Sequence, residues 1–69
     1  MDIGQKIKMI RKARGLSQRE LASRAGLTNG TISLIEKNKS SPSVASLKRL
    51  LDAVPISLSE FFSDFEVED

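Results

Sequence analysis

Apolar residues recur every three or four positions along most of the chain, which is the spacing of amphipathic helices. The first such stretch begins at Ile3, and Gly15 is expected to end it because glycine readily takes the left-handed conformation after a helix. Ser17 and Glu20 then have the spacing of a capping box, in which each side chain bonds the backbone amide of the other residue. A second, short helix is therefore predicted over about residues 17–24.

Three further helices are predicted after Gly26, which ends the second one. Thr28 is the expected N-cap of the third helix, which ends near Glu36 or Lys37. The fourth helix must end before Pro55. A second capping box opens a short fifth helix, and its packing face is expected to complete the core with Leu58, Phe61 and Phe62. The predicted fold class is all-α, with five helices.

The length of the chain, 69 residues, leaves room for a single domain. We assign this domain to residues 1–63, and residues 64–69 to an acidic tail or the start of a linker. Within that tail, Phe65 is the best candidate for an exposed apolar side chain.

Cysteine and histidine are both absent, which excludes disulfides, zinc fingers and histidine acid–base chemistry. Five charged side chains among the first twelve residues argue against a secretory signal, and no apolar run approaches the roughly 20 residues of a membrane span. No nucleophile–base pair or phosphate-binding glycine loop suggests an enzyme. We expect a cytoplasmic protein with no cofactor, no metal and no membrane partner.

Charge is divided unevenly along the chain. Residues 1–49 hold all eleven Lys and Arg against three acids, a balance of +8, whereas residues 50–69 hold six acids and no base, a balance of −6. The formal net charge of +2 hides this contrast. An excess of basic residues over residues 1–49 is expected of a domain that binds a polyanion. An ordinary solvated surface can segregate charge in the same way.

Two short helices joined by a glycine-containing turn meet the requirement of a helix-turn-helix. Residues 16–22 read LSQRELA, residues 26–28 GLT and residues 32–36 ISLIE. This combination resembles the xenobiotic-response-element family, which includes the phage Cro and repressor DNA-binding domains, and the likeness covers residues 3–63. The resemblance implies a lambda-repressor-like fold with the helix-turn-helix at helices two and three. It further implies that helix three lies in the major groove of double-stranded DNA, with a homodimer on a pseudo-palindromic operator.

The outward face of the third helix carries the candidate base contacts. At roughly 100° per residue, with Ile32 and Ile35 pointing inward, Thr28 is also expected to turn inward. An asparagine side chain can bond adenine, and a leucine can contact the thymine methyl group, although an exposed leucine is common on any surface. The residues expected to contact bases are Asn29, Gly30, Ser33 and Leu34.

Candidate phosphate contacts begin at Gln18, which lies at the start of the second helix, where free amides favour an anion. In the resembling family a glutamine at this position contacts a phosphate, and we expect Ser17 to add its backbone amide. The alternative for Gln18 is a solvent-exposed residue in the first turn. For the residues that follow the third helix, the alternative is a flexible polar loop. The residues expected to contact phosphates are Ser17, Gln18, Thr28, Lys37, Lys39 and Ser40.

The resemblance also implies a structural ion pair between Arg11 and Glu36. The family often has a glycine where this chain has Asn38, and asparagine tolerates positive φ. The dimer contact has four apolar candidates, of which the first three are expected instead to complete the core: Leu58, Phe61, Phe62 and Phe65.

The function that the sequence favours is sequence-specific DNA binding in a transcriptional regulator, most readily a repressor. The alternative is a protein-interaction module of the same fold, an antitoxin or a coactivator, which a neighbouring toxin gene would favour. The ending over residues 58–62 is also similar to regulators in which this domain precedes a cupin effector domain.

Overall fold

The structure is a computed structural model that describes residues 2–63. Within that range the chain forms five helices and no strand: α1 (Ile3–Ala13), α2 (Gln18–Ala25), α3 (Asn29–Glu36), α4 (Val44–Ala53) and α5 (Leu58–Phe62). The all-α prediction and the order of the helices are confirmed. The expectation that Phe65 is exposed lies outside the described residues.

Local sequence fixes the helix boundaries. The five helices each begin after a residue whose side-chain oxygen accepts a hydrogen bond from a backbone amide in the first turn, namely Asp2, Ser17, Thr28, Ser43 and Ser57. Of the two predicted capping boxes, the first is complete. The second is half formed among the described residues, because Ser57 accepts from the Glu60 amide but no bond returns from the Glu60 carboxylate.

The ends of the first three helices depend on residues that tolerate positive φ. Gly15 has φ 69° after α1, Gly26 has φ 70° between α2 and α3, and Asn38 has φ 59° after α3. At the end of α3 the amides of Asn38 and Lys39 bond the carbonyls of Ile35 and Leu34, at 3.0 Å and 2.9 Å. Asparagine therefore substitutes for the family's glycine without disturbing the turn, as predicted.

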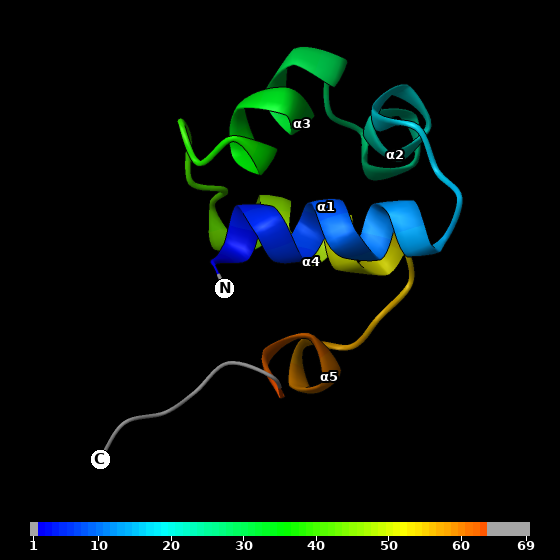
Figure 1. Cartoon of the computed structure of the whole chain (residues 1–69), viewed down its shortest axis with the longest axis vertical. Helices are drawn as coiled ribbons and strands as arrows, with labels where there is room; N and C mark the ends of the chain where they lie inside the picture. Colours follow the sequence, from blue (N-terminus) through cyan, green and yellow to red (C-terminus); the bar gives the residue numbers. More distant parts are fainter. Residues whose placement is uncertain (1, 64–69) are drawn as a thin grey trace.

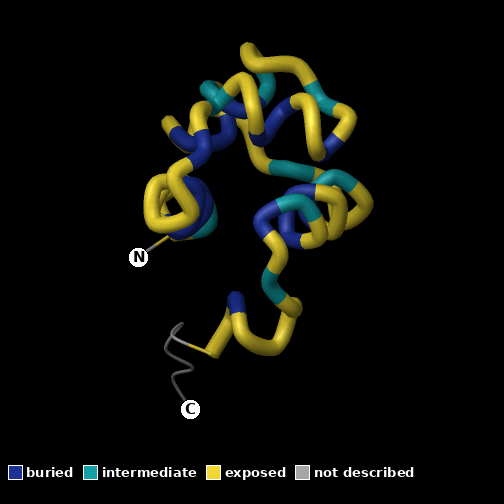
Figure 2. Tube along the Cα trace, turned by 90° about the vertical axis from the view of Figure 1, so that its right-hand side faces the viewer, coloured by how far each residue is buried: buried dark blue, intermediate teal, exposed yellow. Residues whose placement is uncertain are grey.

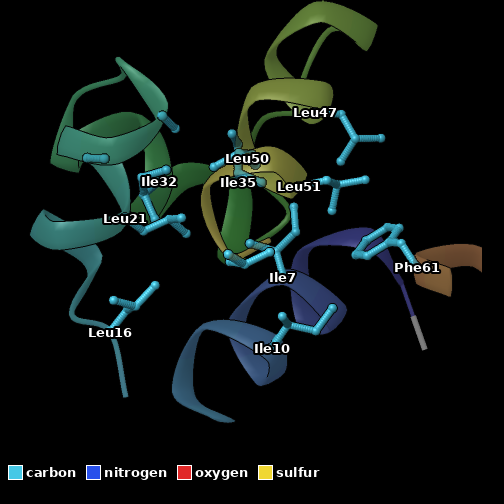
Figure 3. Close-up of a cluster of buried hydrophobic side chains, with 13 residues drawn as sticks. Ile7, Ile10, Leu16, Leu21, Ile32, Ile35, Leu47, Leu50, Leu51 and Phe61 are labelled. Atoms are coloured by element: carbon cyan, nitrogen blue, oxygen red, sulfur yellow. The ribbon is translucent and has the colours of Figure 1, made fainter. Parts of the chain in front are cut away.

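The helices enclose one apolar core. In Figure 1, α2 and α3 lie on one side of α1 and α4, and α5 lies on the opposite side. Figure 2 shows the buried residues on the inward sides of the helices. Side chains from all five helices meet in the close-up of the core, with Ile7, Leu21, Ile32, Leu50 and Phe61 among the most deeply buried (Figure 3).

The fifth helix differs from its predicted packing. Phe61 is fully buried, but Leu58 is 46% exposed and Phe62 is 40% exposed, so the expectation that all three complete the core is wrong for two of them. A helix of five residues has little more than one turn, and only one of its aromatic side chains can point at α1 and α4. The Phe62 ring instead packs edge-on against Phe61, with centroids 5.0 Å apart.

Gly4 sets the distance between α1 and α3, a role that no local pattern in the sequence predicts. The residue is buried, and a β-carbon on it would collide with the carbonyl oxygen of Ile35 and the side chain of Asn38. The two backbones therefore meet directly at the point where α3 ends.

Candidate nucleic-acid interface

The outward face of α3 is open to solvent, while Ile32 and Ile35 on the opposite face are buried. Asn29, Gly30 and Leu34 are exposed, Leu34 by 47%. Ser33 is half-buried, so it presents less of its side chain. The angular spacing of α3 thus correctly predicted which face is open to solvent, and base contact by these residues stays a prediction.

The expectation that Thr28 turns inward is wrong: the residue is exposed. As the N-cap it has extended backbone angles (φ −91°, ψ 155°), so the helical spacing used to orient it does not apply. Its hydroxyl accepts a hydrogen bond from the Thr31 amide at 3.1 Å and lies 2.8 Å from the Thr31 hydroxyl. Thr28 therefore fixes the start of α3 on the same surface as Asn29.

The start of α2 offers free amides one residue later than predicted. The Ser17 amide donates to the Glu20 carboxylate and the Ser17 hydroxyl accepts from the Glu20 amide, both at 3.0 Å. The hydrogen bond from Ser17 holds the pKa of Glu20 below its ordinary value of 4.5. Within residues 2–63, the amides of Gln18 and Arg19 have no bonding partner, so these two can meet an anion.

A buried network links three helices beneath this surface. Arg11 on α1 donates to Glu36 on α3 through Nε at 2.7 Å and Nη2 at 3.1 Å, and through Nη1 to the Leu16 carbonyl at 2.8 Å. Arg11 is 7% exposed and Glu36 is 6% exposed. The pairing that the family resemblance implied is therefore confirmed.

The Gln18 side chain joins the same network, which sequence reasoning missed. Its Nε2 donates to Glu36 Oε1 at 3.0 Å across 18 positions of sequence. No local pattern in the sequence reveals this bond, because it depends on how the start of α2 lies against the end of α3. Gln18 is consequently a half-buried residue with a fixed partner, and not a freely solvated one.

Basic side chains dominate the surface of the described residues. Nine of the eleven Lys and Arg are exposed, whereas Lys6 and Arg11 are buried. The exposed basic residues include the candidate phosphate contacts Lys37 and Lys39, which lie with Ser40 at the end of α3 and in the loop after it. Against these nine bases stand four exposed acids, so the surface favours a polyanion.

Residues 2–63 contain no group of acidic, histidine or cysteine side chains that could hold a metal ion. Their helices are also too short to span a bilayer.

A protein-family model described as helix-turn-helix matches residues 7–61, which is most of the chain. The chain belongs to this helix-turn-helix family. The resemblance to the xenobiotic-response-element proteins is confirmed, while the cupin effector domain stays a prediction.

The helix-turn-helix domain is 47% identical over 66 residues to the HTH-type transcriptional regulator PuuR of Escherichia coli (strain K12), covering 96% of this chain and 36% of PuuR. It is 39% identical over 59 residues to the immunity repressor protein of Bacillus phage phi105, covering 86% of this chain and 41% of that repressor. This chain therefore spans less than half the length of these two relatives.

A solved structure confirms the lambda-repressor-like arrangement of the helices. The wild-type restriction-modification controller protein C.Esp1396I matches with a TM-score of 0.84 and 31% identity, over 88% of this chain and 79% of that one.

Proposed function

We propose that this helix-turn-helix domain binds double-stranded DNA sequence-specifically as part of a transcriptional repressor, with α3 in the major groove. The observation that carries the proposal is the division of α3 into a buried face and an open one. Ile32 and Ile35 hold the helix in the core, and Asn29 and Leu34 are exposed to solvent. Relatives named as transcriptional regulators and an immunity repressor support this function.

The open face of α3 supplies groups that distinguish bases. Asn29 lies in the first turn, where it can bond adenine through both its amide oxygen and nitrogen, and Leu34 offers an apolar surface to a thymine methyl group. Gly30 is exposed and has no side chain, so the backbone of α3 can approach the base edges closely. Ser33, which is half-buried, adds a weakly selective hydroxyl.

Phosphates flank this face in the proposed complex. The start of α2 contributes the free backbone amides of Gln18 and Arg19, and Ser17 beside them caps the first turn. The end of α3 and its loop contribute further donors, and Thr28 lies at the start of α3, so the contacts proposed for phosphate are Gln18, Thr28, Lys37, Lys39 and Ser40, without the Ser17 amide that Glu20 occupies. Most of the affinity is expected from such contacts, which makes binding steeply dependent on salt.

A second copy of the domain is proposed to bind the other half of a pseudo-palindromic operator. One domain of this size covers a single half-site, and two-fold symmetry in the protein mirrors two-fold symmetry in the DNA. Leu58 and Phe62 are exposed on α5, on the side opposite α2 and α3, and they offer an apolar contact for this homodimer.

The test is fluorescence anisotropy with labelled random-sequence duplex DNA over a range of salt from about 50 to 200 mM. We expect a linear fall of log affinity with log salt, and a slope that decreases by about 0.9 when Lys39→Ala removes one phosphate contact. Gln5→Ala, a change of an exposed glutamine on α1, is the control and leaves the slope unchanged.

Sequence preference is tested separately on an operator selected from random DNA. Asn29→Ala is expected to lose roughly 1–3 kcal/mol on that operator and to relax the choice of base at one position. Failure of the wild-type domain to bind any DNA at the lowest salt contradicts the proposal and favours the protein-interaction module of the same fold.

A further inference from the structure

The side chain of Gln18 is held by a carboxylate, although it belongs to the surface proposed to meet phosphate. Its Nε2 donates to Glu36 Oε1 at 3.0 Å, and the Glu36 side chain is 2% exposed. Glu36 is the last residue of α3, so this bond joins the start of the phosphate-binding helix to the end of the base-reading helix.

The Glu36 carboxylate determines whether the nitrogen or the oxygen of the Gln18 side-chain amide faces it. A glutamine amide has an oxygen that accepts and a nitrogen that donates, and a half-turn about its last torsion exchanges them. An ionised carboxylate only accepts, so the bond to Glu36 requires the nitrogen to face it. One N–H is then used by Glu36 and the other remains for an anion, whereas a freely rotating amide would often present its oxygen, which repels phosphate.

Arg11 removes the electrostatic disadvantage of a carboxylate close to a phosphate site. Its guanidinium forms two hydrogen bonds with Glu36 and a third with the Leu16 carbonyl in the turn before α2. The pair is neutral as a unit, and a forked guanidinium–carboxylate pair has fixed geometry. Glu36 can therefore orient Gln18 without adding net negative charge beside the DNA.

We propose that Glu36, neutralised by Arg11, is a positioning residue for phosphate binding. It turns the Gln18 amide so that its second N–H acts on one phosphate together with the free backbone amides of Gln18 and Arg19. The inference rests on the proposed DNA binding. It adds that Glu36, the last residue of α3, orients the phosphate-binding group at the start of α2.

The first experiment needs neither DNA nor a variant. The chain has two glutamines, Gln5 and Gln18, so their side-chain amides are resolved easily by NMR relaxation. We expect the Gln18 amide to be nearly as ordered as rigid backbone, with an order parameter of about 0.8, and the exposed Gln5 amide to fall below about 0.6. A Gln18 amide as mobile as that of Gln5 overturns the inference.

The second experiment measures the phosphate itself, on the selected operator with single phosphates replaced by uncharged methylphosphonates. Replacement of the phosphate that Gln18 contacts is expected to cost the wild type about tenfold to a hundredfold in affinity, the range of one charge-assisted hydrogen bond. Gln18→Ala identifies this phosphate, because its penalty falls in that variant to the part contributed by the backbone amides of Gln18 and Arg19. If no phosphate in an operator that the wild type binds responds to Gln18→Ala, the inference fails while the proposed function stands.

The decisive variant is Arg11→Met combined with Glu36→Leu, which replaces the buried pair with apolar side chains of similar size and is expected to stay folded. Gln18 is intact in this protein but has no carboxylate to orient it. We expect the methylphosphonate penalty at the Gln18 phosphate to fall to within about twofold of the penalty measured in Gln18→Ala, and the penalties that depend on Lys39 to remain. Ile10→Val, a core change beside Arg11, is the control and keeps the full pattern. An undiminished penalty at the Gln18 phosphate in the Arg11→Met/Glu36→Leu variant overturns the inference.

Discussion

Gly4 and Gly30 permit a matched test of two features: the packing of α3 against α1, and the close approach of the α3 backbone to DNA. Each glycine is the second residue of its helix, Gly4 in α1 and Gly30 in α3. A change to alanine therefore brings nearly the same gain in helix propensity at both sites, up to about 1 kcal/mol. The surroundings differ, because Gly4 lies against the end of α3 and Gly30 has room for a methyl group.

The expected magnitude follows from what each new methyl group meets. At Gly4 the methyl collides with the Ile35 carbonyl oxygen, which cannot move easily because it accepts the Asn38 amide at the end of α3. Such overpacking costs roughly 1–3 kcal/mol. At Gly30 the nearest atom is Thr28 Oγ1 at 4.0 Å, which is ordinary contact. Gly4→Ala should thus melt about 5 to 20 °C below Gly30→Ala in a domain of this size.

The assay is thermal and urea unfolding followed by circular dichroism, with operator affinity measured on the same samples at a temperature where both proteins are folded. We expect Gly30→Ala to be at least as stable as wild type but weaker on the operator, because its methyl group separates the α3 backbone from the bases. A Gly4→Ala protein that melts at or above Gly30→Ala refutes the close contact of α1 with α3. Wild-type affinity in Gly30→Ala refutes the close approach of α3 to DNA.

Three further predictions concern the fifth helix, a helix cap and the buried ion pair. Phe61→Ala is expected to cost about 3–5 kcal/mol in urea unfolding, whereas Phe62→Ala costs far less and instead weakens self-association in sedimentation equilibrium. Because the pKa of Glu20 is lowered, its capping bond stabilises the fold above pH 4.5, and this stabilisation is lost as the pH falls through the lowered value. In Glu20→Gln, the free energy of unfolding measured in urea should therefore vary less with pH across that acid range. Arg11→Ala is expected to cost roughly 3–5 kcal/mol, because Glu36 is left buried without a counter-charge, and a loss below about 1 kcal/mol in the same assay contradicts the buried pair.

The features that the sequence predicted correctly are local ones. Ser17 and Glu20 are three residues apart, and Gly26 and Asn38 take positive φ for reasons that lie within their own turns. The open face of α3 also follows from the spacing of its own isoleucines. Local reasoning failed at Thr28, where the residue is outside the helix that was used to orient it.

The features that the sequence did not reveal depend on contacts between helices. The burial of Gly4 requires the end of α3 to lie on it, and the Gln18–Glu36 bond requires α2 and α3 to be placed together. The exposure of Phe62 depends on how a single turn of helix meets α1 and α4. Arg11 and Glu36 are also far apart in sequence, by 25 positions, and only the family resemblance made their pairing predictable.

The network around Arg11 also governs which parts of the fold can open separately. Any motion that lifts α3 from α1 must break the bonds between Arg11 and Glu36. The hydrogen-bonded amides of α1, α2 and α3 should therefore exchange their hydrogens through global unfolding. By contrast, α5 is attached through one buried side chain, Phe61, and its amides should exchange through a smaller opening. A second copy bound to α5 would suppress that opening, so dimer formation would slow exchange in the helix on the side opposite α2 and α3.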